Sequence, residues 1–293
     1  MTKPELFTVF GASGNTGAIV ADRLLAAGKR VRAVVRQPDK AAALAARGAE
    51  LVTGDVGDAR FVAAALAGAT GAYLLVPPAL DAADLLAHCR AVVDHYAAGL
   101  AAAAVRHAVF LSSVGAHVPA GTGPIVSNRY GELTLASAGG TTMTFVRAPF
   151  FMENLLGNAH AMKTDGVLPV FGGGETRPFP MIATGDLGET AAQALLAPPA
   201  ATAWIEMHGP RDYSYADAAA AAGEILGRTV TALPLPLDAM VPTLTRFGLS
   251  PNVAGLFREL NEAIARGLVV YENTCPQVTG RIALTDVLRA RLR

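Results

Sequence analysis

The stretch VFGASGNTGAIVADRLLAAGKRVRAVVRQPDK, residues 9–40, decides the fold. An apolar run ends at Gly11, a helix-patterned run follows, and a second apolar run ends at Arg36. Gly14 and Gly17 lie with Gly11 between the first apolar run and the helix. This order of strand, glycine turn, helix and strand is typical of the first unit of a dinucleotide-binding α/β domain.

The same alternation continues through the first half of the chain. Short apolar runs bounded by turn residues predict strands, and they alternate with helical patterns. The expected strands are 5–11, 30–36, 49–55, 71–77, 107–113 and 141–149, and the expected helices cover about 16–27, 38–47, 58–67, 82–103 and 126–138. Gly28 and Gly48 lie where helix C-terminal glycines belong, and Asp58 is placed as an N-cap. We therefore expect an α/β fold with a doubly wound, Rossmann-like parallel sheet.

The pattern changes after Pro149. Residues 166–181 are rich in glycine and proline and are expected to be irregular. Further elements are expected at 184–196 (helix), 203–209 (strand), 214–226 (helix), 229–235 (strand), and 237–247 and 251–267 (helices). We expect a dinucleotide-binding domain over 1–150, to which 181–208 returns. Residues 151–180 and 209–293 would form a smaller α+β lobe over the carboxyl ends of the strands.

Composition limits the class of protein. The 293 residues are 52% hydrophobic and 16% charged, with zero formal net charge and no basic stripe, so we expect no nucleic-acid partner. The longest apolar stretch, 96–105, is too short to span a bilayer, and the N-terminal residues show no signal-peptide pattern. Cys89 and Cys275 have no metal-like spacing. We expect a cytoplasmic protein with two free thiols, no metal and no membrane contact.

The glycine turn suggests a phosphate site. Backbone N–H groups at a helix N-terminus bind a pyrophosphate, and glycine lets the backbone approach it closely. Ser13, Asn15 and Thr16 could add side-chain hydrogen bonds. The alternative is a tight strand–helix turn without a ligand, since the spacing here is G-x-x-G-x-x-G.

The end of the second strand addresses coenzyme choice. An acid in this region would bind the ribose 2′-hydroxyl of NAD, but the chain has Arg36, with Lys40 one helical turn later. A guanidinium binds a 2′-phosphate with two hydrogen bonds, which favours NADP(H) over NAD(H). The alternatives are that Asp39 supplies the carboxylate, or that Arg36 is only a solvated strand end.

Other strand ends supply further candidates. Asp55 could accept a hydrogen bond from the adenine amino group, and Val76 and Pro77 would form an apolar wall along the coenzyme. Ser112 could contact a substrate oxygen or the nicotinamide ribose, or it could be a buried turn hydroxyl. His117 is the only histidine close to this rim, and it is a candidate for proton transfer.

The motifs together resemble a known family. They are GASGNTG (11–17), VRQPDKA (35–41), GDVGD (54–58), FLSSVGA (110–116) and FVRAPFFMENL (145–155). The chain is similar to the NmrA-like branch of the atypical short-chain dehydrogenases over nearly its whole length. Its layout is closest to bacterial NADPH-dependent quinone and triphenylmethane-dye reductases, and the branch also contains redox-sensing regulators that bind NADP.

The resemblance implies roles for individual residues. The pyrophosphate would be bound by Gly11, Ser13, Gly14, Asn15, Thr16 and Gly17, the 2′-phosphate by Arg36, and the adenine by Asp55 and Val56. The nicotinamide and substrate end would be lined by Phe150, Phe151, Met152 and Asn154. The alternative for the three residues 150–152 is core packing.

The chain lacks the tyrosine–lysine pair of ordinary short-chain dehydrogenases. It has no lysine between Lys40 and Lys163, and Tyr130 is followed four residues later by Thr134. Many relatives carry a lysine four residues before the glutamate that Glu132 matches, and that position is Asn128 here. Its amide could orient a substrate oxygen or the ribose.

These observations disfavour epimerase and alcohol dehydrogenase chemistry, which need a proton relay. We expect an NADPH-dependent oxidoreductase that transfers hydride to a flat, apolar, electrophilic small molecule such as a quinone or dye. The alternative is an NADP(H)-binding sensor that regulates a protein partner without catalysis. A homodimer is left open by the sequence.

Overall fold

A large parallel sheet organises the chain in the computed structural model, which describes residues 5–292. Its eight strands all pair in parallel. In spatial order they are β3 (Glu50–Thr53), β2 (Arg30–Val35), β1 (Leu6–Phe10), β4 (Gly71–Leu74), β5 (His107–Ser113), β6 (Thr142–Ala148), β10 (Ala203–His208) and β13 (Gln277–Thr279). The order reverses between β1 and β4, which confirms the doubly wound sheet and marks the edge where such sheets bind ligands.

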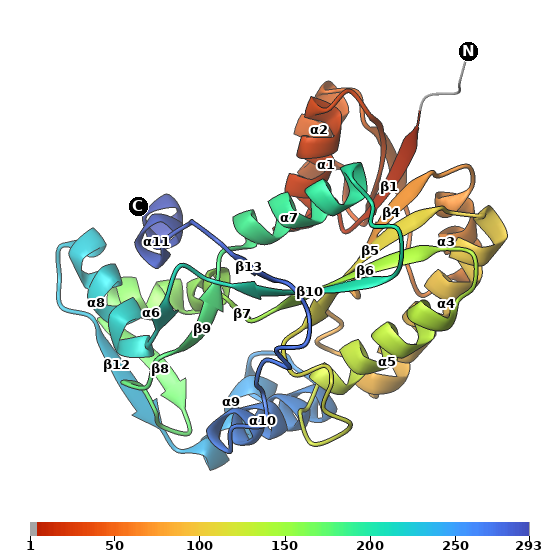
Figure 1. Ribbon diagram of the computed structural model, residues 1–293. Helices are drawn as coiled ribbons and strands as arrows, with labels where there is room; N and C mark the ends of the chain where they lie inside the picture. The colour runs from red at the N-terminus through yellow and green to blue at the C-terminus, as the bar shows by residue number, and fades with distance from the viewer. Residues whose placement is uncertain (1–4, 293) are drawn as a thin grey trace.

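Helices cover both faces of this sheet (Figure 1). On one face lie α1 (Gly17–Ala26), η1 (Pro38–Ala41), α2 (Ala42–Ala46) and α7 (Thr184–Leu196), and on the other lie α3 (Ala59–Leu66), α4 (Leu85–Ala103) and α5 (Ile125–Ser137). The expected cap is present, because the Asp58 side chain accepts a hydrogen bond from the Arg60 N–H at the start of α3. Burial on both faces explains why the central strands are mainly apolar.

A second group of elements packs around its own buried cluster, which includes Met152, Leu168 and Met181. It comprises β7 (Phe150–Phe151), η2 (Met152–Asn158), α6 (Ala159–Thr164), β8 (Val167–Phe171), β9 (Phe179–Ile182), β11 (Asp212–Tyr213), α8 (Tyr215–Leu226), β12 (Thr231–Leu235) and α11 (Leu284–Leu292). We call this group the small lobe. It contains a three-stranded sheet, β11-β9-β7, and a two-stranded sheet, β12-β8.

The expectation of irregular chain over 166–181 is wrong. β8 pairs in parallel with β12, more than sixty residues away, and β9 pairs with β7 and β11. The glycines at 172–174, all with positive φ, occupy the connection between β8 and β9. These strands are stabilised by partners distant in the sequence, so the local glycine and proline content did not reveal them.

The last third of the chain returns to the large sheet. Residues 277–279, which the sequence analysis assigned to the small lobe, form β13 and pair with β10. Before them come η3 (Leu237–Ala239), α9 (Met240–Arg246) and α10 (Pro251–Ala265). The start of α10 is tied to the loop after β4, because the Ser250 N–H donates to the Leu80 carbonyl at 2.9 Å. The Asn252 amide oxygen also accepts the Leu85 N–H at the start of α4.

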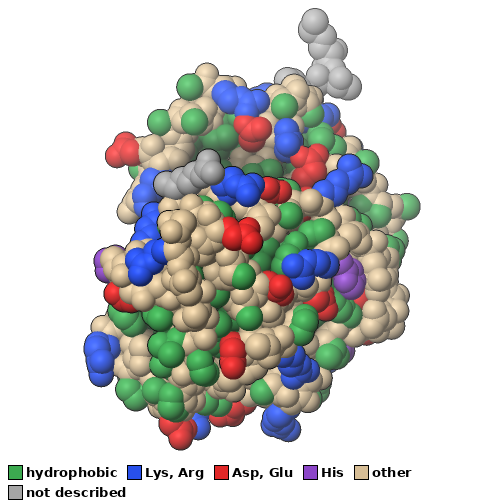
Figure 2. Space-filling model, turned by 90° about the vertical axis from the view of Figure 1, so that its left-hand side faces the viewer, with side chains coloured by type: hydrophobic (Ala, Val, Ile, Leu, Met, Phe, Trp, Pro, Cys, Tyr) green, Lys and Arg blue, Asp and Glu red, His purple; other side chains and the backbone are tan. Residues whose placement is uncertain are grey.

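Charge is mixed on the side of the molecule that carries the small lobe. Figure 2 shows lysine and arginine side chains interspersed with aspartate and glutamate on that face. Among residues 5–292, none of the helices has the length and apolar character needed to cross a bilayer. Within the same residues, histidine, cysteine and acidic side chains form no group of three that could bind a metal ion.

Candidate functional site

The glycine turn joins β1 directly to α1. Gly11 has a φ of +65°, and the Gly14 N–H donates to the Gly11 carbonyl at 2.9 Å. A Cβ on Gly17 would lie 2.3 Å from the Gly11 oxygen, so only glycine allows this approach of helix to strand. Ser13 is half-buried and Asn15 is exposed beside the first turn of α1. The Ala18 and Ile19 N–H groups donate to the Gly14 and Thr16 carbonyls. Within residues 5–292 the N–H groups of residues 15–17 have no acceptor, so they can bind an anion.

Thr16 differs from its predicted role. Its hydroxyl is buried and accepts a hydrogen bond from the Tyr73 hydroxyl at 2.8 Å. Burial raises the pKa of Tyr73, which keeps that phenol protonated as the donor. The Thr16 side chain therefore fixes α1 against β4 and does not face solvent beside Ser13 and Asn15.

An exposed arginine follows the end of β2. Arg36 directly follows the strand and is exposed, and within residues 5–292 its guanidinium makes no ion pair or hydrogen bond. Lys40 is also exposed in η1. Asp39 lies in the same short helix, in its first turn. The two cations lie next to the glycine turn, since the Ala12 N–H donates to the Val34 carbonyl near the end of β2.

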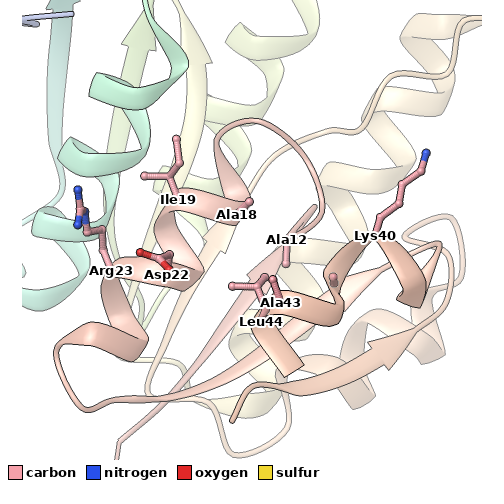
Figure 3. A pocket seen from close by; sticks show the side chains of 9 residues that line it. Ala12, Ala18, Ile19, Asp22, Arg23, Lys40, Ala43 and Leu44 are labelled. Atoms are coloured by element: carbon pink, nitrogen blue, oxygen red, sulfur yellow. The ribbon is translucent and has the colours of Figure 1, made fainter. Parts of the chain in front are cut away.

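A cavity of about 370 Å³ lies between α1 and the η1–α2 segment. Its lining residues are Ala12, Ala18, Ile19, Asp22, Arg23, Lys40, Ala41, Ala43 and Leu44. Figure 3 shows Arg23 and Lys40 on opposite sides of it. Arg23 pairs with Glu189 on α7, and Asp22 pairs with Arg47, so Lys40 is the charged lining residue without an ion pair in the described part of the chain.

The two residues after β3, Asp55 and Val56, differ in exposure. Asp55 is exposed, and its Oδ1 accepts the Gly57 N–H at 2.9 Å, which leaves its second oxygen free to accept. The Val56 side chain is mostly buried, and its carbonyl lies 3.0 Å from Nδ1 of His95. Asp55 thus fits a contact with a ligand amino group better than Val56 does.

The end of β4 forms an apolar wall. The strand stops at Leu74, three residues earlier than expected, and Val76 and Pro77 follow half-buried. Leu75 contacts the glycine turn, since a Cβ on Gly11 would lie 3.1 Å from its Cδ2. Val76 also packs against the cluster that joins α4 to α10.

The end of β5 and helix α5 carry the polar candidates. The Ser112 hydroxyl is buried and donates to Oε1 of Glu132 at 2.6 Å, so the buried alternative for this serine is the one observed. Asn128 is half-buried and lies one turn before Glu132 on α5. Tyr130 donates to Oδ1 of Asp94 at 2.7 Å, so its hydroxyl joins α5 to α4.

His117 lies in the loop between β5 and α5. Its carbonyl accepts a hydrogen bond from Arg129 at 2.7 Å, while its buried Nδ1 has no partner within residues 5–292. His117 lies close enough to Glu272 to act electrostatically on that carboxylate. The backbone carbonyl of His117 therefore holds the residue in place.

The segment after Pro149 only partly matches the prediction. Phe150 packs edge-on against Phe179 and Tyr215 in the small lobe, and Phe151 packs against the core of the large sheet. Met152 is 0% exposed and packs in the buried cluster of the small lobe, as in the core-packing alternative. Asn154 is exposed. A half-buried aromatic pair and one exposed amide are what this motif offers to a ligand.

Sequence reasoning missed a buried ion network centred on Arg147 of β6. Its guanidinium binds Glu132 through two hydrogen bonds and also contacts Glu272, while Glu206 lies 3.7 Å from its Nη1. Trp204 donates to the second oxygen of Glu132 at 3.0 Å. A signal existed in the sequence, because Arg147 and Glu206 are charged residues inside otherwise apolar strands.

A family model decides the classification: residues 3–268 match the model of the NmrA-like family. The chain belongs to the NmrA-like family. This NmrA-like chain is 30% identical to an NAD(P)H azoreductase of Xenophilus azovorans over 285 residues, covering 96% of this chain and 95% of the relative.

Solved structures share the NmrA-like fold. The NADPH-dependent quinone oxidoreductase of Escherichia coli, complexed with NADPH, superimposes with a TM-score of 0.77 at 22% identity, covering 97% of this chain and 99% of that one. The triphenylmethane reductase of Citrobacter sp., complexed with NADP(H), gives a TM-score of 0.77 at 17% identity, covering 98% and 99%. At these identities the structures establish the fold of the NmrA-like chain.

Proposed function

We propose that this NmrA-like chain is an NADPH-dependent oxidoreductase that transfers hydride to a flat, apolar, electrophilic acceptor such as a quinone or dye. The observation that carries the proposal is that the Gly11–Gly17 turn lies beside the end of β2, where Arg36 exposes its guanidinium. The turn offers N–H groups to a pyrophosphate, and the guanidinium offers two donors to a 2′-phosphate. The names of the relatives, an azoreductase, a quinone oxidoreductase and a triphenylmethane reductase, support the same class.

The coenzyme would lie along the carboxyl edge of the sheet. When bound, NADPH supplies the hydride. The residues proposed to bind it are Gly11, Ser13, Gly14, Asn15, Gly17, Arg36, Asp55, Val76 and Pro77. NADP(H) would be preferred over NAD(H), because Arg36 follows the strand directly, whereas the carboxylate that is nearest along the chain, Asp39, lies further on in η1.

The acceptor class follows from the lack of a proton relay. Tyr130 donates its hydroxyl proton to Asp94, and Ser112 donates its hydroxyl proton to Glu132, so both protons are used in contacts within the protein. The chain then contributes proximity and orientation, and the acceptor takes hydride first and a proton from water afterwards. Phe151 and Asn154 are the proposed acceptor contacts, with the Asn128 amide orienting a substrate oxygen or the ribose.

Turnover tests the proposal directly. The purified protein is mixed with NADPH and with a panel of quinones, azo dyes and triphenylmethane dyes, while the absorbance of the reduced nicotinamide is followed. We expect acceptor-dependent loss of that absorbance, faster with NADPH than with NADH. Binding of NADPH without turnover on any acceptor would exclude the reductase.

One observation favours a second function. The hydroxyls of Ser112 and Tyr130 are both used in protein contacts, which also suits an NADP(H) sensor that binds coenzyme without reacting. Calorimetric titration with NADPH and NADP⁺ separates the two functions. The sensor predicts binding of at least one form with negligible hydride transfer to every acceptor in the panel.

A further inference from the structure

The network around Arg147 joins four charged side chains. Nε and Nη2 of Arg147 lie 2.8 Å and 2.7 Å from the two oxygens of Glu132, and its Nη1 contacts both Glu272 and Glu206. Glu206 is 0% exposed, and its two oxygens accept the N–H groups of Glu272 and Asn273 at 2.8 Å and 3.0 Å. Glu272 is the accessible member, with 35% of its side chain exposed.

The network carries more negative than positive charge. Burial lowers the pKa of Arg147, but the hydrogen-bonded carboxylates of Glu132 and Glu272 outweigh this, so its pKa is raised. The Arg147 guanidinium in turn lowers the pKa of Glu272. Three carboxylates against one guanidinium leave a surplus of negative charge that the protein interior screens poorly.

The network lies just beneath the proposed nicotinamide end of the site. Ser112, near the carboxyl end of β5, donates to Glu132, and Asn128 precedes Glu132 by one turn of α5, about 6 Å along the axis. Three residues before Glu272, Val269 packs on Gly115 in the loop after β5. The surplus charge therefore sits one layer below the strand ends at which such sheets bind their ligands.

We propose that this buried network tunes the bound coenzyme toward its oxidised form. The inference rests on the proposed function. Loss of a hydride to the acceptor, with its electron pair, leaves one positive charge on the nicotinamide ring, and the acceptor later takes its proton from water. Negative charge nearby stabilises the positive ring over the neutral reduced ring, which makes the reduced coenzyme a stronger hydride donor.

Removing one carboxylate of the network should measurably change the affinity for NADP⁺ relative to that for NADPH. A unit charge about 12 Å away, at an effective dielectric constant of about 20, alters an equilibrium about tenfold, and partial exposure of Glu272 reduces this. We expect Glu272→Gln to weaken NADP⁺ binding relative to NADPH by roughly three- to tenfold. The quantity measured is the ratio of the two dissociation constants, obtained by calorimetry without any acceptor.

Three further variants test whether the ratio of dissociation constants depends on the charge near Glu272. Glu272→Asp keeps the charge and should keep the ratio of the unmodified protein. Thr274→Lys adds a positive charge at an exposed position beside Glu272 and should shift the ratio in the same direction as Glu272→Gln. Glu224→Gln removes an exposed carboxylate from α8 in the small lobe and should leave the ratio unchanged.

The outcomes separate the two proposals. A shift of the ratio in Glu272→Gln and Thr274→Lys, absent from Glu272→Asp and Glu224→Gln, supports the inference. If Glu272→Gln and Thr274→Lys both bind coenzyme with a ratio of dissociation constants within twofold of that of the unmodified protein, the inference is overturned and the proposed function is not. If the unmodified protein binds neither NADP⁺ nor NADPH, the proposed function itself is overturned.

Discussion

The guanidinium of Arg147 and the carboxylate of Glu132 form a two-pronged ion pair, with both side chains about nine-tenths buried or more. The pair links β6 to α5 on the face that also receives Ser112 and Trp204. Each oxygen of Glu132 accepts two hydrogen bonds, so its removal leaves several donors without an acceptor. This connection explains how a helix of weak amphipathic character is held against the sheet.

Breaking this pair should be costly. Glu132→Gln leaves the buried guanidinium poorly compensated, and loss of one partner of a buried pair costs about 3–5 kcal/mol of unfolding free energy. Chemical denaturation measures the change. Glu262→Gln, which removes the exposed i,i+4 partner of Arg258 on α10, is the matched control and should cost about 0.5 kcal/mol or less. Equal losses in the two variants would contradict the structural importance of the buried pair.

Acid should weaken the fold partly through Glu272. Arg147 holds the pKa of Glu272 below its ordinary value of 4.5 in the folded protein, so protons bind the unfolded chain more readily. This contribution to stability is complete above about pH 5 and is lost as the pH falls through the folded-state pKa. The stability gap between the unmodified protein and Glu272→Gln should therefore narrow between about pH 5 and pH 3. A gap that stays constant over this range, measured by denaturation at each pH, would show that Glu272 is not ion-paired.

The glycine turn should not tolerate a methyl group at its closest approach. Gly17→Ala places a Cβ 2.3 Å from the backbone oxygen of Gly11, and overpacking of this kind costs about 2–3 kcal/mol. Coenzyme affinity should fall as well, because the start of α1 is displaced. Gly139→Ala, at an exposed site with open space around it, is the control and should change stability by about 0.5 kcal/mol or less. The midpoint of thermal unfolding measures both changes. An equally small shift in the two variants would contradict the close contact between Gly17 and Gly11.

Much of the large sheet followed from local pattern. The apolar runs ending near Gly11 and Arg36 are largely buried strands, the run ending near Asp55 is a half-exposed edge strand, and Asp58 caps its helix as expected. These features depend on the residue and its immediate neighbours, so a single sequence contains the information. The glycine spacing likewise reflects a local constraint, since the Gly17 contact lies within the turn itself.

Features that depend on distant partners could not be predicted. The roles of Thr16 and Ser112 are set by Tyr73 and Glu132, which the sequence separates from them by 57 and 20 residues. Met152 was predicted as a site residue because it lies in the motif 145–155, which resembles the family. Its burial depends on contacts with the rest of the small lobe. The ion network could be predicted only by knowing that Arg147 and Glu206 lie side by side on neighbouring strands. The pairing of β6 with β10 in the structure establishes this.

Coenzyme titration of the Arg36→Asp variant tests the central claim most directly. The unmodified protein should bind NADPH at least about tenfold more tightly than NADH, because charge-assisted hydrogen bonds to the 2′-phosphate contribute about 1.5–3 kcal/mol. Arg36→Asp should reverse this preference, while Arg30→Asp, at the opposite exposed end of β2, should preserve it. Equal affinity of the unmodified protein for NADPH and NADH, or no binding of either, would contradict the account.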